Sequence, residues 1–193
     1  LKKLIKLPLT HVSAYMLKIE PDTPYGRNDK LPTLLPDDDE VADMYLQTVE
    51  ALEKAGFMQY EISNFAKEDF QSRHNLKYWH CEEYYGIGPS AHSYVNGVRK
   101  ACPKSVQDFI NAPVQQETVT ENEGGDSEER TMLALRLTRE GMKLSGLTAE
   151  RRNEIMKTAS PMIKAGLMRQ KENSLMLTAK GCLVSNEIIC RLM

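Results

Sequence analysis

The sequence predicts an α/β fold that is followed by a small α+β domain. Residues 11–63 show a strand pattern, a helix pattern and a second strand pattern, which is the order of a βαβ unit. The charge balance then changes: 12 Lys and Arg stand against 7 Asp and Glu from Glu128 onward, but 13 against 20 before it. A polar, glycine-containing segment at residues 121–127, ENEGGDS, separates the two parts and is interpreted as a linker. We therefore predict one domain over residues 1–120 and another over residues 128–193.

The composition of this 193-residue chain, with 41% hydrophobic and 27% charged residues, is typical of a globular protein. No apolar run approaches the ~20 residues that a membrane-spanning helix needs, and no secretion signal opens the sequence. The four cysteines form no disulfide or metal pattern, so we expect reduced thiols and a cytoplasmic location. Because the first residue is Leu1 and not Met, we expect the sequence to be part of a longer polypeptide.

The chain begins with a short helix pattern and a strand pattern. Residues 1–7 are expected to be helical, with Pro8 as the stop, and the alternation over residues 11–20 predicts a strand. Residues 57–63 predict the second strand. Because a helix lies between the two strands, we expect them to pair in parallel and a ligand to bind beyond their carboxyl ends.

The helix between these strands has boundary signals at both ends. Asp37 is expected to cap its start, with Glu40 as the capping-box partner. Gly56 is expected to follow its end. The residues at helical spacing predict an apolar face made of Val41, Met44, Tyr45, Val49 and Leu52.

A hairpin is predicted between residues 90 and 102. Asn96 and Gly97 stand at its centre, and this pair is favoured in type I′ turns because both positions take positive φ. Ser105 is expected to cap a short helix that reaches Ala112.

The last 66 residues predict helices around a second hairpin. Ser127 or Glu128 opens the first helix, Thr148 caps the second, and Pro161 is expected at the first position of a third. Strands at 167–171 and 174–178 flank a turn at Glu172 and Asn173, and the last helix is formed by the apolar residues Leu183, Val184, Ile188, Ile189 and Leu192. This order of elements is a winged-helix pattern.

Residues 60–93 gather the side chains that are best suited to binding. They include three of the four histidines, the only tryptophan and four of the eight tyrosines. On the strand, Glu61 is expected on the face opposite Tyr60, where its carboxylate either meets solvent or holds a polar ligand. Farther on, Gly86 and Gly88 allow the backbone to approach a ligand closely.

The segment HNLKYW has two interpretations. In the first, His74 ligates a metal while a neighbour such as Asn75 fixes its other ring nitrogen, and Tyr78 and Trp79 pack on a planar ligand. In the second, the segment is a turn whose His74 and Asn75 bond the local backbone, with Trp79 filling the core.

Taken together, YEISNFA, HNLKYW and YYGIGPSAHS resemble the oxygen-independent coproporphyrinogen III oxidase-like family of radical SAM proteins. HNLKYW resembles the HemW-type branch of that family, the haem chaperones. The flanks agree, since HVSAYMLKIEPDTPYG is similar to a late barrel strand and RTMLALRLTREGM to the start of the C-terminal domain. The resemblance implies that residues 1–120 are the C-terminal portion of a (β/α) radical SAM barrel, followed by a winged-helix-like domain. The family's CxxxCxxC motif has no match, because the cysteines are scattered at Cys81, Cys102, Cys182 and Cys190.

The resemblance also implies ligands and site residues. Haem is the expected ligand, with SAM and a [4Fe–4S] cluster as cofactors of the full-length protein. His74 is expected to bind the haem iron, with His92 in reserve, and the other haem-binding residues are expected to be Asn75, Tyr78 and Trp79. Expected cofactor contacts are Glu61, Gly86, Gly88 and Ser90, and expected partners of the haem propionates are Arg73, Lys77, Arg99 and Lys100.

The resemblance leaves two functions open. The family's oxidases use SAM and the cluster to decarboxylate propionates of coproporphyrinogen, whereas the chaperone branch binds haem and delivers it. HNLKYW favours haem trafficking, and we expect this chain alone to be inactive as an oxidase. The expected partners are haem or a porphyrinogen, haem-recipient proteins, and a membrane surface contacted peripherally during delivery.

Two alternatives lie outside the family. The winged-helix pattern suggests DNA binding through Arg151, Arg152 and Lys157, but the helix after Ser160 is short for base recognition, so nucleic acid is not expected. A purely structural interaction domain leaves residues 60–93 without an explanation.

Overall fold

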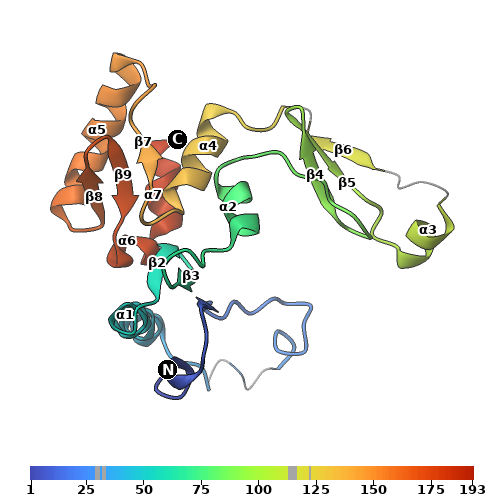
Figure 1. Ribbon diagram of the computed structural model, residues 1–193, viewed down its shortest axis with the longest axis horizontal. Coiled ribbons are helices and arrows are strands. Elements are labelled where there is room, and N and C mark those ends of the chain that lie inside the picture. Colours follow the sequence, from blue (N-terminus) through green and yellow to red (C-terminus); the bar gives the residue numbers. More distant parts are fainter. Residues whose placement is uncertain (29–30, 32–33, 113–116, 122) are drawn as a thin grey trace.

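The computed structural model describes residues 1–28, 31, 34–112, 117–121 and 123–193 (Figure 1). In this part of the chain the strands form antiparallel sheets of three strands each, ordered β1-β3-β2, β4-β5-β6 and β7-β9-β8. The strands are β1 (His11–Ser13), β2 (Met58–Glu61), β3 (Asn64–Ala66), β4 (His92–Val95), β5 (Val98–Ala101), β6 (Thr118–Glu121), β7 (Met142–Lys143), β8 (Met168–Lys171) and β9 (Ser174–Leu177). The helices are α1 (Asp38–Lys54), α2 (Arg73–Trp79), α3 (Val106–Asn111), α4 (Ser127–Leu135), α5 (Ala149–Lys164), α6 (Ala179–Leu183) and α7 (Ser185–Leu192), and a 3₁₀ turn covers Leu4–Lys6.

The second sheet and α3 extend away from the rest of the molecule (Figure 1). We call β4, β5, β6 and α3 the arm. Helix α2 lies between the arm and the β2–β3 hairpin, and the C-terminal helices lie with the third sheet on the other side of that hairpin (Figure 1). Helix α2, which carries His74, therefore lies where the three parts of the molecule meet (Figure 1).

The expected parallel pairing of the first two strands is wrong. The chain turns back after β2 through Ile62 and Ser63, and β3 inserts between β1 and β2, antiparallel to both. The two outer strands consequently run in the same direction without being neighbours. The first strand also ends at Ser13 instead of Glu20, because its partner β3 is only three residues long.

Most of the predicted boundary signals are confirmed. The Asp37 side chain accepts from the Glu40 backbone N–H at 2.8 Å, and the Asp37 N–H donates to Glu40 Oε2 at 3.0 Å, which completes the capping box. Asn96 and Gly97 have φ of 52° and 74°, as a type I′ turn requires. Of the predicted apolar face of α1, Tyr45, Val49 and Leu52 are buried, but Met44 is 58% exposed.

Two C-terminal expectations are corrected. Pro161 does not start a helix, because α5 continues through it to Lys164. Proline has no N–H and leaves the carbonyl four residues earlier without its helical partner. That carbonyl belongs to Lys157, an exposed residue, where water can replace the lost bond. The predicted last helix is divided at Val184 into α6 and α7.

One hydrophobic cluster connects the two predicted domains. It contains Leu52 and Phe65 from the first part and Leu135, Leu175 and Ile188 from the second. Within the predicted linker, the Gly124 N–H donates to the carbonyl of Gly97 at 2.6 Å. The division at residues 121–127 stays a prediction, and its two parts pack against each other through a shared core. In the part of the chain that is described, no helix is long and apolar enough to cross a membrane.

Candidate functional site

The HNLKYW segment forms the helix α2 and is not a turn. Ser72 caps this helix, and its Oγ accepts from the Asn75 N–H at 3.3 Å. The start of α2 is fixed to the first sheet because Tyr60 Oη accepts from the Ser72 N–H at 3.3 Å and bonds His11 Nε2 at 2.8 Å. Burial lowers the pKa of His11 and raises the pKa of Tyr60. His11 was not predicted, since its partner lies 49 residues away and nothing in the local sequence marks the contact.

His74 lies on the exposed surface of α2, where Tyr78 holds its ring. The Tyr78 hydroxyl and His74 Nε2 are 2.8 Å apart, and the two rings meet edge to face at 5.0 Å. This pair follows from helical geometry, because residues four apart are neighbours on a helix. Tyr78 in turn meets the ring of Tyr84 at 4.6 Å, and Tyr84 lies 6.5 Å from Tyr94 of β4. A row of aromatic rings therefore connects α2 to the arm.

Glu61 is buried and does not face solvent, being 1% exposed. Its Oε1 accepts from Nε and Nη2 of Arg136 at 3.1 and 2.7 Å. Its Oε2 accepts from the Ser63 N–H at 2.9 Å and from Asn64 Nδ2 at 2.6 Å. Each oxygen thus has two donors, and the carboxylate joins the β2–β3 hairpin to the end of α4.

Trp79 is held against the same ion pair. The Arg136 guanidinium lies 4.5 Å from the centre of the Trp79 ring, in the geometry of a cation–π contact. One face of the indole is therefore covered by protein. Its Nε1 is buried and has no hydrogen-bond partner among the described residues. These contacts fix the C-terminal end of α2.

The other two histidines of the stretch lie elsewhere. His80 Nε2 is 2.8 Å from Glu140 Oε2, and its Nδ1 is 3.7 Å from Glu82 Oε1. His92 is exposed and pairs with Ala101 in the arm. His92 precedes Tyr94 by two residues on β4. It therefore lies farther from α2 along the arm than Tyr94, whose ring is the one next to Tyr84. No contact between His74 and His92 occurs in the described part of the chain.

The glycine-containing loop packs on the arm. The Gly86 N–H donates to Ser93 Oγ at 3.0 Å, and a side chain at Gly86 would clash with the carbonyl oxygen of His92. Gly86 is therefore needed for contact with protein backbone. Gly88 has φ of 114° with open space beside it, and the Ser90 N–H donates to the Pro103 carbonyl at 3.0 Å.

The four basic residues expected near the ligand differ in their surroundings. Arg99 pairs with Glu129 and lies 4.5 Å from the centre of the Tyr94 ring. Lys100 is 3.9 Å from Glu117, and Lys77 is 3.6 Å from Glu82. The Arg73 side chain, next to His74, is exposed and makes no ion pair with the residues that the structure describes.

The described residues contain no group of three or more His, Cys, Asp or Glu that is placed to hold a metal ion. Cys81, Cys102 and Cys182 are buried and Cys190 is exposed, and none forms a disulfide. Burial raises the pKa of Cys182 to about 11, which disfavours the thiolate that metal binding requires. The residues that the structure describes therefore do not fit a [4Fe–4S] cluster.

Comparison with known proteins identifies relatives over nearly the whole chain. It is 32% identical over 203 residues to the heme chaperone HemW of Bacillus subtilis and 30% identical over 200 residues to that of Lactococcus lactis, with 95% and 97% of this chain covered. It is also 44% identical over 95 residues to the heme chaperone HemW of Escherichia coli, which covers 49% of this chain and 24% of that protein. The chain spans about half the length of the first two relatives, 51% of each. No family model matches the sequence.

Among solved structures, the coproporphyrinogen III oxidase of Escherichia coli, described as a radical SAM enzyme, has the same fold. The TM-score is 0.68 at 16% sequence identity, over 99% of this chain and 49% of that one. The expected fold is the C-terminal part of a radical SAM barrel followed by a small α+β domain. The structural match confirms it at the level of the fold.

Proposed function

Because this chain belongs to the oxygen-independent coproporphyrinogen III oxidase-like family, with relatives of the HemW type, we propose that it binds haem and takes part in haem trafficking. The observation that carries the proposal is the exposed imidazole of His74, which Tyr78 holds on a helix anchored at both ends. A cytoplasmic location is part of the same proposal.

The pair His74–Tyr78 supports iron ligation by the imidazole. When His74 Nε2–H donates to the Tyr78 hydroxyl, the lone pair of Nδ1 is left for a metal. Metal-binding histidines in proteins usually have one ring nitrogen fixed by a hydrogen bond in this way, and the bond orients the ring. Tyr78 is thus proposed as a positioning residue and His74 as the iron ligand.

Two cations on α2 support recognition of the haem propionates. Arg73 and Lys77 are four residues apart on the helix, beside the row formed by His74 and Tyr78. Arg73 is exposed, and a guanidinium can bind a carboxylate through two parallel hydrogen bonds. Lys77, Arg99 and Lys100 each have a carboxylate neighbour, so Arg73 is the strongest of the four candidates.

The remaining expected contacts stay proposals of lower rank. Only the face of Trp79 away from Arg136 is left for a porphyrin. His92, Gly86, Gly88 and Ser90 belong to the arm side of the molecule, and they would meet the same ligand as His74 only if it extended across the aromatic row. Asn75 contributes only its backbone N–H to the Ser72 cap, so its side chain remains a proposed haem contact. Glu61 acts in the buried ion pair.

Oxidase chemistry is not assigned to the residues of this chain. SAM and a [4Fe–4S] cluster supply radical chemistry in radical SAM enzymes, but the described residues hold no ligand set for a cluster. A porphyrinogen remains a second ligand, because its propionates present the same carboxylates to Arg73 and Lys77.

Exposed apolar side chains on the arm, and on the loop before it, support contact with a haem recipient or a membrane surface. Ile87 is 84% exposed and Tyr85 is 78% exposed, and on α3 Val106 and Ile110 are 61% and 66% exposed. Tyr85 and Ile87 belong to the loop before β4, and a hydrogen bond from the Ser90 N–H to the Pro103 carbonyl connects this loop to the segment before α3. Apolar residues of this kind can enter the lipid headgroup boundary or a partner's groove.

Titration with haemin, followed by the Soret absorbance, tests the proposal. The His74→Leu variant should bind at least about tenfold more weakly and shift the Soret band, and Tyr78→Phe should weaken binding less. His80→Leu is the matched control, since His80 pairs with Glu140 away from Tyr78. Haemin binding that is unchanged in His74→Leu and lost in His92→Leu would show that the iron ligand is wrongly assigned. A wild-type chain that does not bind haemin would refute the proposed function for these residues.

A further inference from the structure

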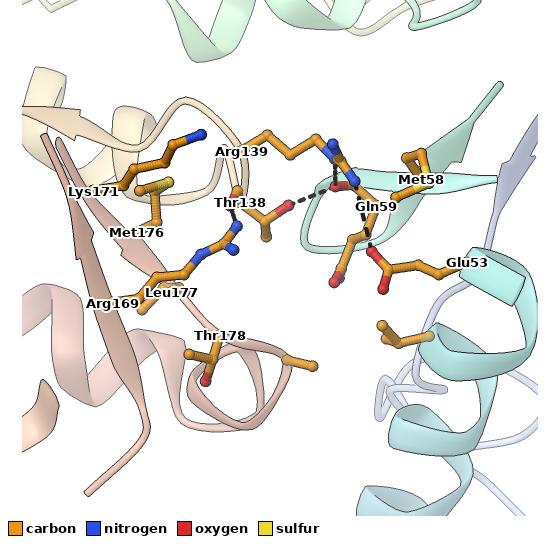
Figure 2. A pocket seen from close by; sticks show the side chains of 12 residues that line it. Glu53, Met58, Gln59, Thr138, Arg139, Arg169, Lys171, Met176, Leu177 and Thr178 are labelled. Atoms are coloured by element: carbon orange, nitrogen blue, oxygen red, sulfur yellow. Dashed lines mark hydrogen bonds and ion pairs between the residues drawn. The ribbon is translucent and has the colours of Figure 1, made fainter. Parts of the chain in front are cut away.

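A cavity on the far side of the β2–β3 hairpin carries positive charge that the proposed haem site does not use. Its volume is about 400 Å³, within the range of small-molecule sites. It lies between α1 and β2 on one side and β8, β9 and α6 on the other (Figure 2). No residue of α2 or of the arm is among the described residues that line it.

Three cationic side chains from two segments line this cavity. Arg139 follows α4, whereas Arg169 and Lys171 lie on β8 and reach from the β8–β9 hairpin toward β2 (Figure 2). Glu53 of α1 is the one carboxylate among the described lining residues. The cavity wall therefore carries a net charge of about +2 from these four groups.

Neutral backbone carbonyls hold the two guanidinium groups in place. Arg139 Nε donates to the carbonyl of Gln59 at 3.2 Å, and Arg169 Nη2 donates to the carbonyl of Thr138 at 2.9 Å. Thr138 itself is buried and donates from its hydroxyl to Gln59 O at 2.9 Å, which joins the two anchors (Figure 2). A carbonyl orients a guanidinium without cancelling its charge, and a guanidinium has five N–H donors, so most donors stay available. Arg139 Nη2 approaches Glu53 Oε1 only to 4.0 Å.

The rest of the lining is mixed, since Gln59, Thr138 and Thr178 are polar and the other residues are apolar. Met58, Met176 and Leu177 contribute side chains to the cavity, together with Val49 and Ala179. A ligand with an oxyanion at one end and a compact apolar body would satisfy both kinds of wall. We propose that this cavity binds a small organic oxyanion, bearing phosphate or carboxylate groups, between Arg139, Arg169 and Lys171. The site is independent of the proposed haem function.

Binding of pyrophosphate and of citrate to the whole chain, measured by calorimetry at fixed ionic strength, tests the site. We expect at least one of them to bind with a Kd below about 10 mM. Lys171→Gln should weaken binding about tenfold, because a hydrogen bond to a charged group is lost. Its side chain makes no hydrogen bond or ion pair with the described residues, so folding should not change. Arg169→Gln should weaken binding further, and circular dichroism will check that this variant is folded.

Arg152→Gln is the matched control, because Arg152 on α5 bonds the side chain of Asn173 outside the cavity. Equal weakening by Arg152→Gln and Lys171→Gln would mean general attraction to a basic surface and would overturn the proposal. Absence of binding by both probes would overturn it as well. Preference for pyrophosphate would identify a phosphate-bearing ligand, and preference for citrate a carboxylate-bearing one, and either supports the site.

Discussion

Removal of the Glu61 carboxylate should be among the most damaging single changes at the candidate site. Glu61→Ala takes away an acceptor that is 1% exposed and leaves donors on Arg136, Ser63 and Asn64 without their partner. Removing one member of a buried ion pair costs about 3–5 kcal/mol. Because the Arg136 side chain is 29% exposed, water can solvate part of the remaining charge, and we expect the lower end, about 3 kcal/mol. In a chain of this size that corresponds to a fall in Tm of roughly 6–12 °C.

Urea unfolding followed by circular dichroism will measure this effect, with Arg136→Ala and the double variant completing a cycle. We expect the two single changes to be strongly non-additive, because each removes the same contact. Glu187→Ala is the control: Glu187 pairs with Arg191 at the same 2.7 Å as the shorter Glu61–Arg136 bond, but both side chains are more than 60% exposed. An exposed pair of this kind should contribute less than about 1 kcal/mol. Equal losses of stability from Glu61→Ala and Glu187→Ala would refute the conclusion that the Glu61–Arg136 ion pair stabilises the fold through its burial.

Three further outcomes are expected. Burial holds the pKa of His11 below its ordinary value of 6.5. Between the lowered pKa and pH 6.5, the folded state therefore binds fewer protons than the unfolded state. Stability should fall as the pH drops below 6.5 toward the lowered pKa, and in a His11→Asn variant thermal melts between pH 8 and about 5 should show a flatter dependence. Gly97→Val should cost at least about 1–2 kcal/mol in urea unfolding, because Gly97 has φ of 74°; an unchanged midpoint would contradict the type I′ turn. Cys190, the exposed cysteine, should react rapidly with a thiol reagent in the native chain, and Cys190→Ser should abolish that fast phase.

Features fixed by neighbouring residues could be predicted from the sequence. The capping box of Asp37 and Glu40 and the type I′ turn at Asn96 and Gly97 each depend on contacts within four residues. The contact of His74 with Tyr78 is also local, but it was not predicted: Asn75 was expected to fix the His74 ring, because HNLKYW was not expected to form a helix. A segment whose amino acids satisfy its local geometry keeps that geometry in the folded protein.

Contacts between distant segments could not be predicted in this way. Glu61 and Arg136 are 75 residues apart, and His11 and Tyr60 are 49 apart. The alternation along the strand places Tyr60 and Glu61 on opposite faces of the sheet. It does not predict that other parts of the chain bury both faces, as they do here. The insertion of β3 between β1 and β2 also depends on a distant contact, since Val12 of β1 pairs with Phe65 of β3.

Some of the residues expected at the site stabilise the fold, whereas His74 is exposed and is proposed to bind iron. Haem-binding assays must treat the two groups differently. Three of the residues stabilise the fold: Glu61 through its ion pair with Arg136, Trp79 through the cation–π contact, and Gly86 through its close approach to the His92 backbone. A variant at any of these positions will lower the free energy of unfolding, so a loss of haem binding there does not identify a ligand contact. His74 is exposed, and its removal leaves the anchors at both ends of α2 intact. A loss of binding in His74→Leu at unchanged Tm is for that reason the result that separates ligation of iron from support of the fold.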